Sequence, residues 1–312
     1  MVGMVAAPPP SEDTSAASPA ASPNEARATL PSWMHLVGAP HSLRTQSRVG
    51  RVPDGEPAGH ADSWGIGWFD AQGQVSLLRQ TGWAEDSAYY VFAAEAAAQS
   101  STLSGPATVL IGHLRKASRG AVTSENAHPV RADFARRAGD DRPGYDTLLV
   151  AHNGTLRDPL LNTLRADLRD KVEEARSDSD TVVLAAWLAD RATGTADVFA
   201  ALAEALRELL ARVPQVVSVG EERQSYSALN LLIADGNGDL YALRQFSHDP
   251  DYYTLSARPG QRGEGVSVLI ASEPTDGQPG WEPLTPGELV CFGADGTVRT
   301  ARVTAAPAGA TS

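Results

Sequence analysis

Four short segments of the sequence carry most of the side chains that could do chemistry on a small molecule. In chain order they read Gly-His-Leu-Arg at 112–115, Asn-Ala-His-Pro at 126–129, Ala-His-Asn-Gly at 151–154 and Ser-Asp-Ser-Asp at 177–180. An arginine can bind a carboxylate through its planar fork, and an aspartate can bind an ammonium group. An asparagine amide beside a glycine N–H can stabilise a developing oxyanion.

Each of these residues also has an ordinary structural explanation. Arg115 could be a surface residue of a strand, and Asn153 with Gly154 could form a common turn. Asp178 could cap a helix rather than bind a ligand. Taken singly, none of the four segments therefore identifies a site, and only their combination and order carry weight.

The histidines and the single cysteine do not indicate a metal site. His113, His128 and His152 show neither His-x-x-x-His nor His-x-His spacing, so we expect them not to bind a metal. Cys291 lies in an apolar run typical of a buried strand, and we interpret it as a core residue rather than a nucleophile. One cysteine excludes a disulfide framework, and with no phosphate-binding glycine loop we expect no cofactor.

Taken together and in this order, the segments resemble the class II glutamine amidotransferases, whose glutaminase domain is an N-terminal-nucleophile hydrolase. Members of that family usually begin Met-Cys-Gly-Ile-Val-Gly, and the cysteine becomes the first residue and the nucleophile. This chain begins Met-Val-Gly-Met-Val-Ala, so Val2 stands at the matching position. A valine side chain has no lone pair with which to attack an amide. The resemblance therefore implies a glutamine site without its usual nucleophile.

The resemblance also implies a role for each polar residue. Arg115 matches the arginine that binds the substrate α-carboxylate, and Asp178 matches the aspartate that binds the α-ammonium group. Asn153 and Gly154 match the pair that forms the oxyanion hole, through a side-chain amide and a backbone N–H. Two opposite charges at one end of the pocket would select a free α-amino acid and set its orientation.

Further matches extend the resemblance over residues 1–6 and about 33–292. His128 matches a segment that lines the pocket, and Asn126 two residues earlier fits the same segment. Ser-Glu-Pro at 272–274 and Trp281 match short stand-alone members, including γ-glutamyl amide hydrolases of ergothioneine and glutathione metabolism. The resemblance thus implies action on the γ-amide of glutamine or of a γ-glutamyl compound.

The missing nucleophile leaves three explanations open. Val2 could be an engineered inactivating change, or the chain could be a natural pseudoenzyme that serves as a ligand-binding or partner-binding module. Alternatively, processing could expose Thr14, Ser15 or Ser18 as a new first residue. We expect the protein as written not to hydrolyse glutamine at a useful rate, because losing a nucleophile leaves only residual effects.

The residues that follow the matched region indicate which partner proteins to expect. Only a short Ala/Pro/Gly-rich tail follows it, without a nucleotide-binding or sugar-phosphate-binding segment. We therefore expect any amide transfer to involve a separate synthetase, and we favour stand-alone hydrolysis of a γ-glutamyl amide over ammonia channelling.

Strands and helices alternate between these segments. Apolar runs bounded by turn formers predict strands over residues 2–6, 64–69, 75–78, 109–113, 147–152, 228–234, 239–244, 267–271 and 289–292. Helical spacing predicts helices over residues 88–99, 181–192 (capped by Asp178 or Ser179) and from about 196. Grouped strands and helices favour antiparallel sheets, and the resemblance sharpens this to a four-layer αββα sandwich in the α+β class.

The domain organisation follows from composition. We expect a first strand at residues 1–6, a flexible Ala/Pro/Ser-rich insertion over 7–31, the amidotransferase-like domain over 32–303, and a disordered tail at 304–312.

Bulk composition narrows the possible partners. The net charge of −12 argues against nucleic acid, which needs a basic footprint. Neither a membrane-spanning apolar run nor a secretory signal is evident. We expect a cytoplasmic protein.

Overall fold

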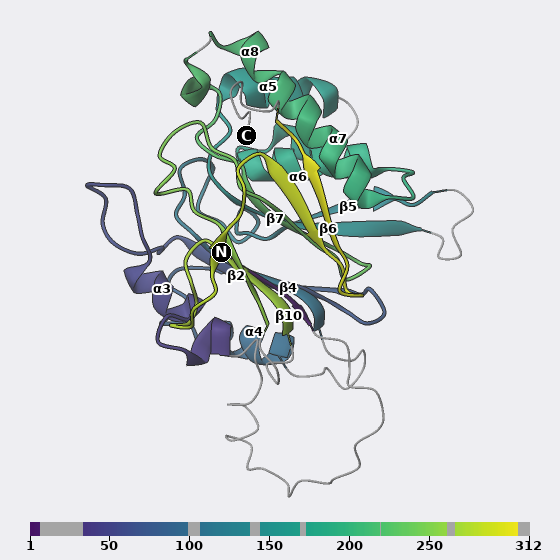
Figure 1. Ribbon diagram of the computed structural model, residues 1–312. Coiled ribbons are helices and arrows are strands. Elements are labelled where there is room, and N and C mark those ends of the chain that lie inside the picture. The colour runs from purple at the N-terminus through teal and green to yellow at the C-terminus, as the bar shows by residue number, and fades with distance from the viewer. Residues whose placement is uncertain are drawn as a thin grey trace, which may run out of the picture.

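The computed structural model describes residues 1–6, 34–98, 107–137, 144–168, 173–218, 220–260 and 266–304. Within these ranges two antiparallel sheets lie face to face, with helices on both outer surfaces (Figure 1). The predicted flexible insertion over 7–31 lies outside the described residues, as does the predicted tail apart from Thr304.

The first sheet has seven strands in the order β11-β9-β10-β1-β4-β2-β3. At its centre β1 (Val2–Ala6) pairs with β10 (Val266–Ala271) on one side and β4 (Ala107–Arg115) on the other. The remaining strands are β2 (Ser63–Asp70), β3 (Val75–Thr81), β9 (Ser256–Pro259) and β11 (Glu282–Pro283). The N-terminal segment is therefore an integral central strand.

The second sheet has six strands in the order β13-β12-β8-β7-β6-β5. Its members are β5 (Val130–Ala135), β6 (Tyr145–Asn153), β7 (Asn230–Asp235), β8 (Leu240–Leu243), β12 (Glu288–Phe292) and β13 (Val298–Arg302). Strand β6 ends at Asn153, and β4 of the first sheet ends at Arg115, so both key polar residues lie where strands stop.

Helices cover the two outer faces. The first sheet carries a π-helical turn η1 (Met34–Gly38), α3 (Leu43–Val49) and α4 (Ala88–Ala98). The second sheet carries α5 (Asp158–Leu168), α6 (Asp180–Ala192) and α7 (Val198–Ala211), and the short α8 (Val213–Val216) follows α7. Two single 3₁₀ turns, η2 (Glu173–Arg176) and η3 (Glu222–Gln224), complete the described helices. Among all of these, none is long and apolar enough to cross a membrane.

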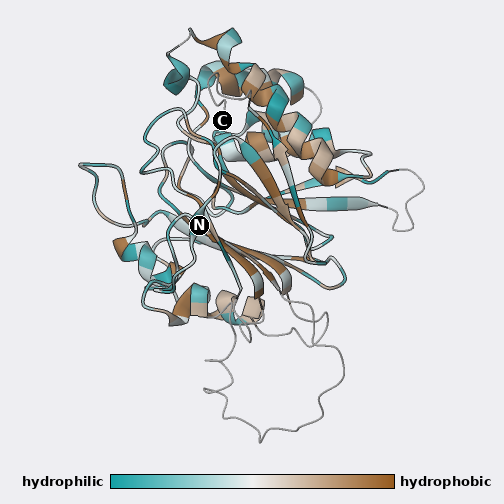
Figure 2. Cartoon of the chain, in the orientation of Figure 1, coloured by the Kyte–Doolittle hydropathy of each residue, from teal (hydrophilic) through white to brown (hydrophobic). Residues whose placement is uncertain are grey.

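Strand alternation divides the core into three apolar layers. Successive side chains of a strand point to opposite faces, so each sheet contributes to an outer and an inner layer. In β1, Val2 and Met4 pack under the helices, whereas Val5 packs between the sheets. Gly3 also faces inward, where an added Cβ would lie 3.0 Å from Leu240 Cδ2. Apolar colouring runs along the strands accordingly (Figure 2). The protein has the four-layer αββα sandwich that the sequence predicted.

Helix α6 positions the fourth polar segment, residues 177–180, within the fold. The helix begins at Asp180, and the hydroxyl of Ser179 caps it by accepting a hydrogen bond from the Val182 N–H. Of the two predicted caps, Ser179 is therefore confirmed, and Asp178 lies before the helix. The end of β4, the end of β6 and the beginning of α6 lie together at one edge of the sandwich.

Candidate active site

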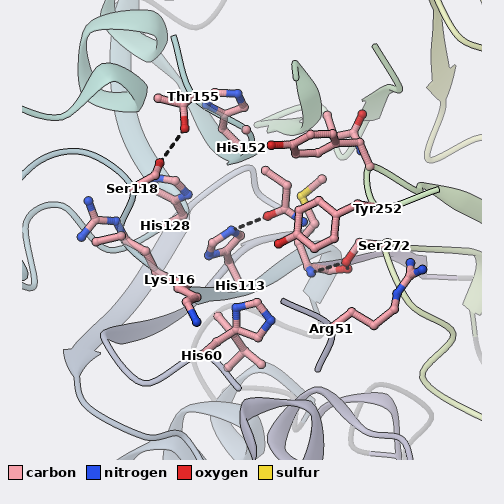
Figure 3. Close-up of a pocket in the computed structure, with 18 of the residues that line it drawn as sticks. Arg51, His60, His113, Lys116, Ser118, His128, His152, Thr155, Tyr252 and Ser272 are labelled. Carbon is pink, nitrogen blue, oxygen red and sulfur yellow. Dashed lines mark hydrogen bonds between the residues drawn. The ribbon is translucent and has the colours of Figure 1, made fainter. Parts of the chain in front are cut away.

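A cavity opens at this edge of the two sheets (Figure 3). Its volume is about 190 Å³, smaller than the ~300–1,000 Å³ of pockets for drug-sized ligands. Of the seven residues that the resemblance places in the site, four line this cavity: Arg115, His128, Asn153 and Gly154. Three others, Val2, Asn126 and Asp178, are not among the lining residues.

Arg115 ends β4 with a side chain that is only 4 % exposed. Its guanidinium donates to the carbonyl oxygens of Ala121, at 3.1 Å, and Arg119, at 2.5 Å. Burial lowers the pKa of Arg115, and the Asp180 carboxylate opposes this most strongly among its neighbours. Arginine keeps its charge across the physiological range, so the cavity holds a fixed cation with five N–H donors.

Asp178 is solvent-exposed and turns its carboxylate toward the loop that follows β4. It accepts hydrogen bonds from the Ala121 N–H, at 2.8 Å, and from Asn126 Nδ2, at 3.1 Å. These two bonds, the Ala121 N–H first, lower the pKa of Asp178. Asn126 thus contacts Asp178 rather than the cavity.

Asp180, the last residue of the same motif, does line the cavity. Its side chain is buried, and its Oδ2 accepts a hydrogen bond from the Leu156 N–H at 2.7 Å. That bond ties the start of α6 to the chain just after the end of β6. The family resemblance gave the role of ammonium ligand to Asp178 and gave no role to Asp180.

Asn153 and Gly154 lie together at the end of β6. Asn153 Oδ1 is 2.9 Å from His113 Nε2, so the amide is held by a neighbouring strand. Gly154 has a φ of 145°, and a Cβ there would lie 2.1 Å from the carbonyl oxygen of Ala228. Only glycine fits this backbone. The pair thus has the residue types that oxyanion stabilisation requires, on the wall of the cavity.

Imidazoles form much of the cavity wall, including His60, His113, His128 and His152. Burial, followed by the neighbouring imidazole, holds the pKa of both His113 and His128 well below the usual value. Burial likewise lowers the pKa of His60 to about 4. The rings of His113 and His128 lie 4.5 Å apart. In the part of the chain that the structure describes, no group of three or more metal-ligating side chains is arranged to hold an ion.

The first residues of the chain lie beside this wall. Val2 is fully buried in the apolar layer under the helices, so its side chain points away from the cavity. Met1 lines the cavity instead, and its α-amino group donates to Ser272 Oγ at 2.8 Å. Burial lowers the pKa of this amine to about 6, against the raising influence of Glu273. Val2, which the family resemblance matches to the nucleophile, is therefore a core residue in this structure.

A further part of the wall comes from a loop that lies outside the sequence motifs. Tyr252, Tyr253 and Thr254 line the cavity opposite the imidazoles. The loop is held by Asn230, whose Nδ2 donates to the Thr254 carbonyl oxygen at 3.2 Å. Arg51 also binds it through Thr254 Oγ1, at 2.5 Å. No periodic pattern marks these residues, and only their position in the folded chain identifies them.

Ser272 and Glu273 of the Ser-Glu-Pro segment line the cavity beside the N-terminus, whereas Cys291 lies in the core. Gln46 Nε2 donates to the carbonyl oxygens of Glu273 and Pro274, both at 3.3 Å, which fixes the segment beside Met1. Cys291 is buried under α7, and burial raises its pKa to about 12. The interpretation of Cys291 as a core residue is confirmed.

Sequence comparisons show which family this chain resembles. A family model described as "Glutamine amidotransferases class-II" matches residues 46–311. Two curated relatives are glutamine–fructose-6-phosphate aminotransferases. The protein of Idiomarina loihiensis is 29 % identical over 148 residues, which are 47 % of this chain. That of Streptomyces coelicolor is 33 % identical over 144 residues, or 42 % of this chain. The match covers only 20 % of each relative's length.

Solved structures show the same fold at low sequence identity. An allosteric regulatory enzyme of purine biosynthesis aligns over 97 % of this chain and 48 % of its own, with a TM-score of 0.56 and 17 % identity. A class II glutamine aminotransferase domain protein from Silicibacter pomeroyi aligns over 78 % of this chain and 92 % of its own, with a TM-score of 0.50 and 20 % identity. The sandwich is that of the N-terminal-nucleophile amidotransferases. With the family model matching most of its length, this chain belongs to the class II glutamine amidotransferases.

Proposed function

We propose that the cavity binds the α-amino-acid end of glutamine or of a γ-glutamyl compound, with Arg115 on the α-carboxylate. The observation that carries the proposal is a buried, fixed guanidinium on the same cavity wall as Asn153 and Gly154. A carboxylate is the natural partner of a guanidinium in such a setting. The small cavity volume favours a ligand the size of an amino acid.

The α-ammonium group needs a carboxylate, and the Ser-Asp-Ser-Asp motif supplies two. The family resemblance assigns this role to Asp178, which is exposed and bound to the loop after β4. Asp180 lines the cavity and is the strongest opposite charge felt by Arg115. We keep Asp178 as the proposed ligand, and Asp180 is the alternative that the cavity wall favours.

We further propose that the chain, with Met1 and Val2 as written, binds the ligand without hydrolysing its γ-amide. A thioether and an isopropyl group cannot form a covalent acyl intermediate. The amine of Met1, with a pKa of about 6, has the character of the family's base but no adjacent thiol to activate. Such a chain would act as a binding module, either alone or beside a separate synthetase.

Ligand selectivity tests the binding proposal. Calorimetry should detect L-glutamine, and N-acetylglutamine and 4-aminobutanamide should each bind about tenfold more weakly or worse, because each lacks one charged partner. Equal affinity for all three compounds would remove the basis for the proposed orientation.

Ammonia release tests the proposed inactivity. The chain should release no ammonia from glutamine above background, and intact-mass measurement of the same sample establishes which residue stands first. Substantial turnover by a chain that begins at Met1 or Val2 would overturn this part of the proposal.

A further inference from the structure

His113 is the one residue that contacts the Asn153 side chain through a hydrogen bond among the described residues. It lies on β4 of the first sheet, whereas Asn153 ends β6 of the second sheet. Their 2.9 Å contact therefore joins the two sheets at the cavity. His113 and Arg115 are two residues apart on one strand, so their side chains leave the same face of the sheet.

Two arrangements of this contact are chemically possible. In the first, His113 Nε2 carries the proton and donates to Asn153 Oδ1, which leaves the amide N–H groups of Asn153 free for the cavity. In the second, the carboxamide is turned over, so that its Nδ2 donates to an unprotonated Nε2 and its Oδ1 faces the cavity. The two arrangements have opposite consequences, because only the first offers donors to a ligand oxygen.

The surroundings of His113 favour the first arrangement. His113 Nδ1 is buried and has no hydrogen-bond partner in the described structure. In the second arrangement this atom would carry the ring proton, so an N–H donor would be buried without an acceptor. Such a donor costs about 1–3 kcal/mol. In the first arrangement Nδ1 only keeps an unused lone pair, and the low pKa of His113 keeps the ring neutral with a single proton.

We infer that His113 is a positioning residue: its Nε2–H turns the Asn153 carboxamide so that Nδ2 donates into the cavity, to the γ-carbonyl oxygen of the ligand. This inference rests on the proposed binding of a γ-amide compound. His113 does not touch the ligand in this role. It determines whether the Asn153 carboxamide presents its NH2 group or its oxygen to the ligand, and thereby makes Asn153 a donor rather than an acceptor.

The chain offers a matched pair of variants. His113→Gln retains a donor near the position of Nε2, whereas His113→Asn has a shorter amide that cannot reach Asn153 Oδ1. Each variant is titrated with L-glutamine and with L-2-amino-5-methylhexanoate, an analogue that keeps the α-amino-acid end but has a hydrocarbon side chain without a carbonyl. The second ligand reports the integrity of the rest of the cavity.

His113→Asn should bind glutamine about tenfold more weakly, the loss expected for one hydrogen bond. Its affinity for the hydrocarbon analogue should not change, and His113→Gln should recover most of the glutamine affinity. Parallel losses for both ligands, or unchanged glutamine affinity in His113→Asn, would overturn the inference. Failure of the unmodified chain to bind glutamine would instead reject the proposed function.

Nitrogen-15 NMR of the unmodified chain tests the inference independently of ligand binding. The imidazole signals of His113, assigned by their loss in His113→Gln, should show a neutral ring protonated at Nε2. A neutral ring protonated at Nδ1 would overturn the inference, whatever the binding data show.

Discussion

Arg115 and Asp178 are linked through a single residue, Ala121. The carbonyl oxygen of Ala121 accepts from Arg115 Nη1 at 3.1 Å, and its N–H donates to Asp178 Oδ2 at 2.8 Å. The loop after β4 therefore connects the two charged residues that the sequence motifs place at the amino-acid end of the ligand. These bonds hold the cation in place, which lowers the entropic cost of binding.

The two aspartates of the motif should be separable by substitution. Asp178→Asn should weaken glutamine binding about tenfold with little loss of stability, because its carboxylate is exposed. Asp180→Asn should lower the melting temperature, because both buried carboxylate oxygens accept backbone N–H groups, of Leu156 and Thr181, and an asparagine keeps only one acceptor oxygen. Calorimetry and thermal melting of both variants make the comparison. If Asp178→Asn binds glutamine normally and a folded Asp180→Asn does not, Asp180 is the ammonium ligand.

A cysteine placed as the first residue should give glutaminase activity only if its side chain leaves the same face of β1 as that of Met1. Strand alternation puts a cysteine at residue 2 under the helices, with Val2 and Met4. A cysteine inserted directly before Val2 takes the place of Met1, whose side chain lines the cavity. Ammonia release from glutamine, measured after removal of the initiator methionine, should therefore appear in this variant and not in Val2→Cys. Activity confined to the residue 2 variant would contradict the strand register.

Gly154→Ala should destabilise the protein far more than Gly194→Ala, which serves as the matched control. Both Gly154 and Gly194 have positive φ, but a Cβ at Gly154 meets the Ala228 carbonyl oxygen at 2.1 Å, whereas nothing lies within 4 Å at Gly194. We expect Gly194→Ala to lower the free energy of unfolding by about 1 kcal/mol, and Gly154→Ala by about 3 kcal/mol or more. Urea denaturation measures both, and equal losses would contradict the close approach.

The pH dependence of stability should respond to Asp235. Burial, with a smaller contribution from Asp239, raises the pKa of Asp235 in the folded chain to about 7, while the Tyr241 hydroxyl and nearby N–H groups oppose the shift. A raised folded pKa favours the protonated form, so its stabilisation is complete below about pH 4 and is lost as the pH rises to 7. Asp235→Asn cannot ionise. Its stability relative to the parent should therefore rise by a few kcal/mol, on the order of magnitude of the shift, between pH 4 and 7 and then level off. A difference independent of pH would contradict the raised pKa.

Much of this fold could be predicted from the sequence, because its strands are apolar and bounded by turn formers. The hairpin of β2 and β3, the strand β6 that delivers Asn153, and helix α6 all occur where the pattern predicts them. Strand β5 and helix α5 were not predicted. The side chains of β5 do not alternate regularly between buried and exposed positions, because one face of the strand is partly exposed.

The site was predicted less completely, for identifiable reasons. Met1 and Val2 are both apolar, so hydrophobicity does not reveal which of them faces the cavity; pairing with β4 and β10 decides it. The loop bearing Tyr252 has no periodicity and reaches the cavity through bonds to distant residues. His113 was visible as a motif residue, but its partner Asn153 lies 40 residues away on the other sheet.

Glutamine titration of the unmodified chain and of Arg115→Ala tests the central claim most directly. We expect a measurable affinity for L-glutamine that falls at least about tenfold in Arg115→Ala, because a charge-assisted pair with the α-carboxylate is lost. Thermal melting of the variant controls for loss of the bonds to Ala121 and Arg119. Equal glutamine affinity in a folded Arg115→Ala would contradict the account.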